Sequence, residues 1–265
     1  MTHVVVTGAS SGIGAALVAE FVRSGAAVTL VARRRAEMEA LTATLHGKTQ
    51  IFAVDLSDPA TALSFLEPAQ QAFGPVDVLS NNAGQQIVEP AEEHDPIALQ
   101  RMLSLNLTVP LLLTRAVLPA MLARGRGTIV DVASVAGLAP TPGMWGYNAS
   151  KGGLGAASES LRGELRGTGV HVVTVYPGPV DTPMARAGYA AYPNNAAMSL
   201  LPEGDADELA QLVRGAVELS RPRVIYPLSY ALIRYFPTIV RWFLDRMTPR
   251  PKSRLSAAAG DASHG

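Results

Sequence analysis

Short apolar runs alternate with longer amphipathic stretches along most of the chain. The short runs are rich in valine, and they predict strands at residues 3–7, 27–32, 50–54, 76–80, 127–133, 170–176 and 223–226. The amphipathic stretches predict helices at residues 13–24, 34–45, 61–73, 102–123, 147–166 and 205–219. Strands that are apolar throughout are typical of a parallel sheet covered on both sides. With right-handed crossovers, the pattern predicts an α/β fold, a doubly wound (Rossmann) parallel sheet of about seven strands with helices on both faces.

The composition excludes several classes of protein. The 265 residues include 22 basic and 22 acidic side chains, so the formal net charge is zero, and 48% of the residues are hydrophobic. A chain kept disordered by charge would have a high net charge and few hydrophobic residues. A strongly basic nucleic-acid binder would have an excess of basic side chains. The chain has no cysteine, which removes disulfides, thiolate metal sites and cysteine nucleophiles. Its five histidines are scattered and predict no metal site.

The start of the chain indicates no targeting segment. The apolar strand at residues 3–7 lacks the basic start and the longer apolar core of a signal peptide. A run of about 18 uncharged apolar residues, which a membrane-spanning helix would need, does not occur. We therefore expect a cytoplasmic protein built around one large folded domain.

A glycine-rich segment, TGASSGIG at residues 7–14, joins the first predicted strand to the first predicted helix. Glycine permits a tight turn and lets the backbone approach a ligand closely. The N–H groups and the partial positive charge at a helix start suit a pyrophosphate. Such a turn can also be purely structural, but the strand before it and the helix after it favour dinucleotide binding.

Three side chains could contact the adenosine part of a dinucleotide, and two of them bear on whether it is NAD or NADP. The second strand is followed by Arg33 and Arg34, where an acidic residue would accept hydrogen bonds from a ribose hydroxyl of NAD. Arginines there can pair with the extra phosphate of NADP, although they also fit a solvated start of the next helix. Asp55 follows the third strand and could receive the adenine amino group or cap the next turn. The pattern favours NADP(H) over NAD(H).

Tyr147 and Lys151 lie four residues apart, on one face of one predicted helix. A nearby ammonium lowers the pKa of a phenol, so the pair could act as a general acid and base. This spacing alone is common and usually structural. Ser134 strengthens the catalytic interpretation because it follows the fifth strand, at the carboxyl edge where doubly wound sheets bind ligands. There its hydroxyl could hold a substrate carbonyl.

Taken together, these motifs resemble the short-chain dehydrogenase/reductase family over residues 3–226. The matching positions, in the family's order, are residues 7–14, Asp55 and Leu56, residues 81–84 (NNAG), Asn106, Ser134, residues 147–151 (YNASK) and residues 177–182 (PGPVDT). Each match is weak alone, and the joint match is specific. Ser80 and Ala133 depart from the family, which favours an apolar residue and a second serine there, but neither is a proposed catalytic group.

The resemblance implies hydride transfer between a nicotinamide cofactor and a carbonyl or alcohol. Tyr147 would exchange the substrate proton, Ser134 would orient the carbonyl, and Lys151 would hold the nicotinamide ribose and tune Tyr147. Asn106 would anchor a water that links Lys151 to solvent. The predicted cofactor-binding residues are Gly8, Ser10, Ser11, Ile13, Gly14, Arg33, Arg34, Asp55, Leu56, Asn82, Ala83, Gly84, Tyr147, Lys151, Pro177, Gly178, Val180 and Thr182.

The family pattern also suggests a substrate lid. Residues 1–226 would form the dinucleotide-binding and catalytic domain, and residues 184–205 within it would form the lid. The apolar side chains of this region favour an apolar substrate, although ordinary loop packing explains them as well; they are Met184, Tyr189, Tyr192, Met198, Leu200 and Leu201.

A basic and apolar segment ends the chain. Residues 221–254 carry eight basic side chains against Asp245 alone, with aromatic side chains between them. We expect a helix at residues 238–247 within an extension at residues 227–248, and then a disordered tail at residues 249–265. Three interpretations fit: peripheral membrane contact through residues 229–254, a subunit contact or pocket cap, and a purely structural helix.

The sequence therefore predicts an NADP(H)-dependent oxidoreductase for a hydrophobic substrate such as a steroid, a retinoid or a lipid. A 3-oxoacyl-thioester reductase is the alternative within the enzyme class. A regulator that senses NADP(H) without turnover is the alternative outside it, but a sensor need not keep Ser134, Tyr147 and Lys151. The family resemblance further implies a homodimer or homotetramer.

Overall fold

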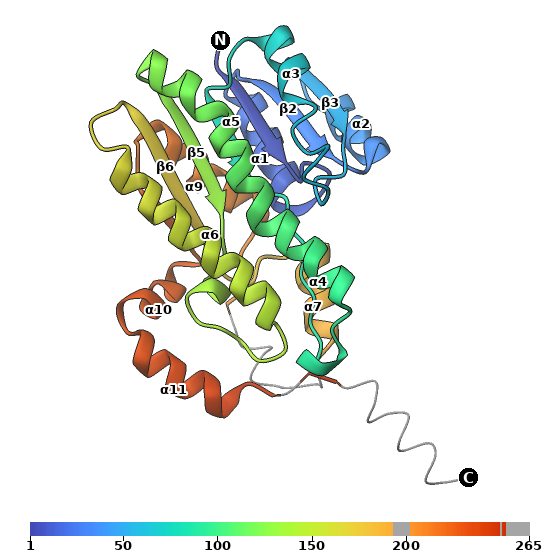
Figure 1. The fold of residues 1–265 in the computed structure, drawn as a ribbon, viewed down its shortest axis with the longest axis vertical. Coiled ribbons are helices and arrows are strands. Elements are labelled where there is room, and N and C mark those ends of the chain that lie inside the picture. The colour runs from blue at the N-terminus through green and yellow to red at the C-terminus, as the bar shows by residue number, and fades with distance from the viewer. Residues whose placement is uncertain (193–201, 250, 253–265) are drawn as a thin grey trace.

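The computed structural model describes residues 1–192, 202–249 and 251–252. Its centre is a sheet of seven parallel strands in the order β3-β2-β1-β4-β5-β6-β7 (Figure 1). The strands are β1 His3–Thr7, β2 Ala27–Ala32, β3 Thr49–Ala53, β4 Val78–Asn81, β5 Gly127–Val132, β6 Val170–Pro177 and β7 Arg223–Tyr226. Each predicted strand is present within two residues of its predicted bounds.

The order of the strands reverses beside β1. This strand pairs with β2 on one side and with β4 on the other, because the chain returns from β3 to the centre of the sheet. The loops after β1 and β4 therefore lead away in opposite directions and leave a crevice between them. A ligand site is expected at this point of a doubly wound sheet.

Helices cover both faces of the sheet, which confirms the predicted fold class (Figure 1). One face holds α1 Gly12–Arg23, α2 Arg35–Ala43 and α9 Ala206–Glu218, and the other holds α3 Leu66–Phe73, α5 Val109–Arg124 and α6 Trp145–Glu164. Along β1, Val4 and Val6 enter the first buried cluster and Val5 enters the second. Side chains alternate between the two faces of a strand, so both faces must be apolar.

A long helical run crosses the face that carries α5. It consists of α4 Pro96–Leu103, the π-helical turn η2 Ser104–Thr108, and α5. Among the described residues it is the one helix long and apolar enough to span a membrane by length and composition. Leu113 and Met121 are fully buried in the cluster against the sheet. This packing accounts for its hydropathy, since a core helix of a folded domain passes the same test.

Two predicted helix starts are wrong. The helix predicted from residue 102 begins at Pro96, because the Asp95 carboxylate accepts hydrogen bonds from the N–H groups of Ile97 and Ala98. An aspartate followed by proline is a recognised start signal. The helix predicted from residue 61 begins only at Leu66, because Asp58 holds the preceding residues in turns.

Four short elements lie beyond the carboxyl ends of the strands (Figure 1). They are α7 Pro183–Ala190, η4 Leu228–Tyr230, α10 Ala231–Tyr235 and α11 Pro237–Met247; two further 3-10 turns are η1 Ala91–Glu93 and η3 Val135–Gly137. The first part of the predicted lid is thus helical. The rest of that lid, with Met198, Leu200 and Leu201, lies outside the described residues.

The start of the predicted disordered tail contacts the folded body. The N–H of Lys252 donates to the carbonyl oxygen of Ala191 at 3.0 Å, and its Nζ donates to the carbonyl oxygen of Ala190 at 3.4 Å. The ring of Pro251 lies against Gly143. Residues 253–265 of the predicted tail lie outside the described part of the chain.

Candidate active site

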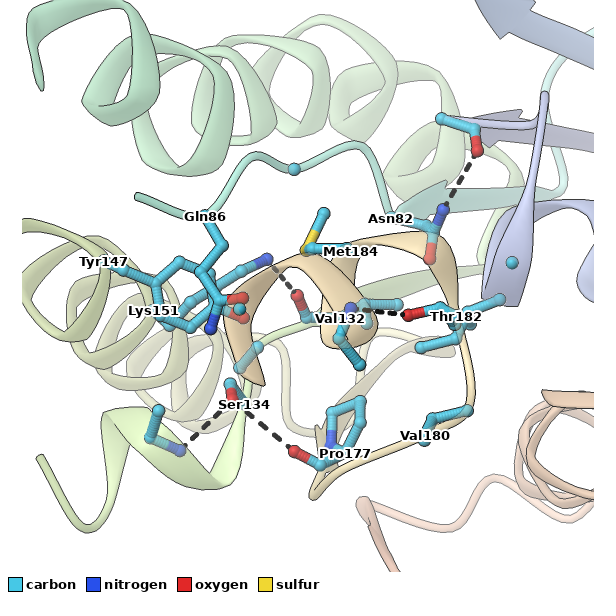
Figure 2. Close-up of a pocket in the computed structure, with 18 of the residues that line it drawn as sticks. Asn82, Gln86, Val132, Ser134, Tyr147, Lys151, Pro177, Val180, Thr182 and Met184 are labelled. Atoms are coloured by element: carbon cyan, nitrogen blue, oxygen red, sulfur yellow. Dashed lines mark hydrogen bonds between the residues drawn. The ribbon is translucent and has the colours of Figure 1, made fainter. Parts of the chain in front are cut away.

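A cavity of about 800 Å³ opens at the carboxyl edge of the sheet. It is lined by the loops that follow strands β1 to β6, together with α6 and α7. Every site residue predicted from the sequence lines this cavity except Asn106. In Figure 2, Tyr147, Lys151 and Ser134 lie toward the left of the cavity, and Asn82 and Thr182 lie toward the right.

The glycine-rich turn leaves no room for side chains. A Cβ atom on Gly14 would lie 2.1 Å from the carbonyl oxygen of Gly8, and one on Gly8 would lie 2.7 Å from the Cα of Ala83. Gly8 and Gly12 also have positive φ values of 68° and 53°. Within the described chain, the Ser11 side chain makes no cap hydrogen bond to the first turn of α1. The first N–H groups of this helix therefore stay available to a ligand such as a pyrophosphate.

Thr7 ties the ends of β1 and β4 together beneath this turn. Its hydroxyl donates to the carbonyl oxygen of Ser80 at 3.1 Å and accepts from the N–H groups of Asn82 and Ala83, both at 3.0 Å. The side-chain amide of Asn82 donates to the carbonyl oxygen of Thr7 at 3.0 Å. The sequence analysis included Thr7 only as part of the motif and gave it no role of its own. Its signal was a polar residue at the end of an otherwise apolar strand.

The basic side chains after β2 lie next to the serines of the turn. The Arg34 guanidinium donates to the Ser10 hydroxyl at 2.9 Å and to the Ser11 hydroxyl at 2.7 Å. Its nearest carboxylate is that of Glu37, at 3.8 Å. Arg33 is exposed and lines the same cavity. Two guanidinium groups thus flank the expected adenosine end, a geometry that suits a phosphate.

Asp55 and Leu56 close the same end of the cavity. The Asp55 carboxylate accepts from the N–H and the hydroxyl of Ser57, at 3.0 and 2.8 Å. The backbone hydrogen bond from Ser57 lowers the pKa of Asp55 below its ordinary value. Asp55 therefore holds its own loop, as the capping alternative predicted, while it also lines the cavity.

The three side chains expected to do chemistry converge from two elements. Ser134 follows β5, and its hydroxyl accepts from the N–H of Ala136 at 3.1 Å and donates to the carbonyl oxygen of Pro177 at 3.5 Å. Tyr147 and Lys151 project from α6, and Lys151 Nζ donates to the carbonyl oxygen of Val132 at 2.7 Å (Figure 2). All three side chains are buried.

Burial moves the pKa values of both titratable groups. It raises the pKa of Tyr147 above 10.0, and a hydrogen bond from Ser134 opposes that shift. The predicted lowering of the Tyr147 pKa is therefore wrong, because desolvation of the phenolate outweighs the favourable interactions around it. Burial also lowers the pKa of Lys151 to about 8, so this ammonium titrates close to neutral pH.

A buried carboxylate that the sequence analysis did not select lies behind Lys151. Asp131, on β5, accepts from the side-chain amide of Asn81 at 2.8 Å. Burial raises the pKa of Asp131, and the charge of Asp131 in turn raises the pKa of Lys151. A polar residue within the apolar strand at residues 127–133 was the signal that could have found it.

Asn106 lies in the wall behind the cavity rather than on its surface. It belongs to η2, whose wider turn directs it to the loop after β4. Its amide exchanges two hydrogen bonds with the backbone of Gln85, each at 2.8 Å, and donates to the Ser150 hydroxyl at 3.0 Å. A Cβ atom on Gly84 would lie 3.4 Å from both Asn106 Oδ1 and Lys151 Nζ, so Asn106 is close to the lysine. Its predicted role as a water anchor stays a prediction.

The segment after β6 forms the floor between the two ends of the cavity. The Thr182 hydroxyl accepts from the N–H of Ala185 at 3.2 Å and caps α7. Gly178 donates its N–H to the carbonyl oxygen of Tyr226 at 2.7 Å, and Val180 pairs with Gly204. These bonds fix the path of the loop that was predicted to hold a nicotinamide.

The remaining wall is mostly apolar and comes from distant parts of the chain. Of the predicted lid residues, Met184, Tyr189 and Tyr192 line it. Tyr192 is anchored by a hydrogen bond from its hydroxyl to the carbonyl oxygen of Pro142 at 2.6 Å. The wall also includes Gln86, Val88 and Met144, for which no role was predicted, and Tyr230, Ile233 and Val240 of the C-terminal extension, which agree with the pocket-cap interpretation of that segment. Their positions depend on how separate elements pack together.

Comparison with known proteins places this architecture in a family. Residues 2–192 match the family described as short chain dehydrogenase. The chain belongs to the short-chain dehydrogenase/reductase family. It is accordingly an oxidoreductase that acts on alcohol or carbonyl groups and uses a nicotinamide dinucleotide.

Several relatives of this short-chain dehydrogenase/reductase share more than a third of the aligned residues with it. A short chain dehydrogenase of Pseudocercospora fijiensis is 37% identical over 67% of this chain and 59% of its own length. A fatty acyl-CoA reductase of Mycobacterium tuberculosis is 37% identical over 69% of this chain and 64% of its own length. A 1-deoxy-11-beta-hydroxypentalenate dehydrogenase of Streptomyces exfoliatus is 38% identical, over 69% and 68%. The match therefore spans about two thirds of the length of these relatives.

Solved structures extend the likeness beyond residue 192. A short-chain dehydrogenase from Streptomyces avermitilis has a TM-score of 0.78 at 26% identity and covers 92% of this chain and 95% of its own. A 3-ketoacyl-(acyl-carrier-protein) reductase from Brucella melitensis, complexed with NADH, has a TM-score of 0.75 at 27% identity. The match covers 85% of this chain and 96% of the reductase. A metagenomic short-chain oxidoreductase in complex with NADP has a TM-score of 0.69 at 32% identity. The match covers 84% of this chain and 96% of the oxidoreductase. Of these similar structures, one is thus a complex with NADH and another a complex with NADP.

Proposed function

We propose that this short-chain dehydrogenase/reductase interconverts a hydrophobic carbonyl and its alcohol with NADP(H), and that Tyr147 is its general acid and base. The observation that carries the proposal is the convergence of Ser134, Tyr147 and Lys151 in the cavity that the glycine-rich turn also lines. A regulator that only senses the dinucleotide would not need a buried phenol, hydroxyl and ammonium in one place, since burial of such groups is unfavourable.

The side chains divide the work as follows. In reduction, the hydroxyls of Ser134 and Tyr147 hold the carbonyl oxygen, and Tyr147 gives it a proton. Its raised pKa keeps the phenol protonated at neutral pH, as an acid requires. Lys151, with a pKa of about 8, is mostly charged at neutral pH and binds ribose hydroxyls of the cofactor. When bound, the nicotinamide ring donates or accepts the hydride.

The preference for NADP(H) rests on the basic end of the cavity. Arg33 and Arg34 line it, and Arg34 also contacts the serines of the glycine-rich turn. An extra phosphate on the adenosine ribose would accept hydrogen bonds from these guanidinium groups. Reduction is the favoured direction because NADPH usually serves reduction.

The apolar wall supports a hydrophobic substrate. Met184, Ile233 and Val240 face the cavity without offering hydrogen bonds, so selectivity would come from shape and burial. A 3-oxoacyl thioester is the second candidate, because the similar proteins include a fatty acyl-CoA reductase and a 3-ketoacyl-(acyl-carrier-protein) reductase. NADPH consumption against a panel of steroid, retinoid and acyl-thioester carbonyls separates the two.

Substitution of the phenol tests the catalytic proposal. Tyr147→Phe removes only the hydroxyl, so turnover should fall by about 10²–10⁴-fold while NADPH still binds. Steady-state kinetics and NADPH fluorescence titration measure the two effects. Tyr189→Phe is the matched control, since Tyr189 lines the same cavity. Turnover by Tyr147→Phe at the level of this control would reject the assigned acid.

We further propose a cytoplasmic homodimer or homotetramer. The support is the family to which the chain belongs. Sedimentation velocity at several protein concentrations measures the assembly, and a single monomeric species throughout would reject it.

A further inference from the structure

Residues 228–242 expose an unusual concentration of large apolar side chains. Leu228, Leu232, Tyr235, Phe236, Ile239 and Trp242 are each more than half exposed. On the rest of the described chain, no helix or strand has more than two exposed apolar side chains of this size. An apolar surface of this extent is unfavourable in water unless something covers it. We call these six residues the apolar patch.

The orientation of the apolar patch is fixed by contacts on its inner side. Ile233 and Val240 point into the active-site cavity. Arg234 lies 3.6 Å from Glu159 on α6, and Arg241 donates to the carbonyl oxygen of Pro140 at 3.0 Å. Elements α10 and α11 are therefore attached to the body, and the patch faces outward. Figure 1 shows both helices at the rim of the molecule, beyond the carboxyl ends of the strands.

Positive charge accompanies the exposed apolar side chains. The Arg246 guanidinium lies 4.5 Å from the centre of the Trp242 ring. Ile239, Trp242 and Arg246 are three and four residues apart, so they share one face of α11. Over residues 221–254 the sequence has eight basic side chains and one acidic one, although Arg223 and Arg234 are paired with Glu159 on α6. Tryptophan beside arginine suits the boundary between lipid tails and phosphate groups.

We propose that the apolar patch docks on the surface of an anionic lipid bilayer. Its apolar side chains would enter the headgroup region, and Arg246 would face lipid phosphates. A second copy of the chain fits less well, because a two-fold contact would bring two copies of the positively charged Arg246 to the same interface. The charge of the segment complements a negative surface and opposes self-association.

The docking has a consequence for catalysis, which rests on the proposed function. The helix that carries Trp242 on its outer face carries Val240 on the cavity wall. An apolar carbonyl dissolved in the bilayer would then reach the cavity without crossing water. The substrate class that follows is a lipid-soluble carbonyl taken from the membrane.

Vesicle flotation of the full chain tests the docking directly. The protein should float with phosphatidylcholine vesicles that contain phosphatidylglycerol, and bind vesicles of phosphatidylcholine alone much more weakly. Trp242→Ser and Ile239→Ser should each lower partitioning by about tenfold, because each removes a large apolar side chain from the interface. Arg246→Glu should weaken binding to the anionic vesicles only. Leu219→Ser is the matched control, since Leu219 is 63% exposed and lies outside the apolar patch, at the C-terminal end of α9.

A fluorescence measurement keeps the test independent of flotation. The chain has two tryptophans, so Trp145→Phe leaves Trp242 as the sole reporter. Anionic vesicles should shift its emission to the blue and protect it from iodide. Unchanged emission and quenching, or equal flotation of Trp242→Ser and Leu219→Ser, would overturn the proposal. Dissociation of an oligomer by Trp242→Ser, without vesicle binding by the unaltered chain, would assign the patch to a second copy instead.

Turnover separates this proposal from the proposed function. Trp242→Ser should keep NADPH binding and turnover of a water-soluble carbonyl, and lose turnover of a carbonyl carried in anionic vesicles. Tyr147→Phe should lose both reactions and still float. An inactive but membrane-bound chain would therefore reject the catalytic assignment alone, and an active chain that never binds vesicles would reject the docking alone.

Discussion

The two ends of the cavity are lined by different kinds of groups. At the β1–β4 end, glycine backbone and short polar side chains face the cavity, and Thr7 ties the strands together with three hydrogen bonds. At the opposite end, α7, α10 and α11 supply separate apolar side chains that gather only through packing. Backbone geometry tolerates almost no substitution, whereas an apolar wall tolerates changes of similar volume. The first end suits one fixed ligand, and the second can vary with the substrate.

Adding a methyl group to the turn should have the largest effect. In Gly14→Ala the new Cβ would lie 2.1 Å from the carbonyl oxygen of Gly8, so the turn must shift. We expect the free energy of unfolding, measured with urea, to fall by about 3 kcal/mol. We also expect NADPH binding, measured by titration, to be lost. Gly163→Ala is the control: its Cβ meets nothing within 4 Å, and it should stabilise α6 by about 0.5–1 kcal/mol. Equal stability of the two variants would show that the turn tolerates a Cβ atom at residue 14.

Charge reversal at the residues after β2 should change the dinucleotide preference. With Arg33 and Arg34 both replaced by Asp, NADPH would lose its phosphate partners, while NADH could gain a ribose acceptor. The NADPH/NADH ratio of kcat/KM should fall by about 10- to 100-fold. An unchanged ratio would show that these arginines serve only the solvated start of α2.

Trimming the apolar wall should affect the substrate and spare the cofactor. Ile233→Ala removes apolar contact from the cavity, so KM for a hydrophobic carbonyl should rise by up to about tenfold. The Kd for NADPH should stay the same, which titration of the same variant checks. A parallel loss of NADPH affinity would mean that the two ends are not independent.

The smallest effect should appear in the pH profile. Burial lowers the pKa of Lys151 to about 8, and the charge of Asp131 keeps that pKa from falling further. Asp131→Asn keeps an oxygen for the Asn81 amide but removes the charge, so the lysine should lose its proton at lower pH. The alkaline fall of kcat/KM should therefore move to lower pH, whereas an alkaline fall that stays in place would show that Asp131 does not tune Lys151.

The alternation of apolar runs and helical stretches determined the seven strands, their parallel sheet and the carboxyl edge at which the motifs meet. It could do so because side-chain periodicity and glycine turns act over a few residues. The same reasoning placed Ser134 at that edge and Tyr147 and Lys151 on one helix face, and the family resemblance then implied that the three act together.

Only the tertiary structure decided the rest. The pKa of Tyr147 rises because the folded chain buries the phenol, and no spacing of residues reports how much water a fold removes. Asp131 comes to lie behind Lys151, and Ile233 and Val240 reach the cavity, through contacts between segments far apart in the chain. Burial and electrostatic environment are properties of the packed whole, which is why the sequence alone left them open.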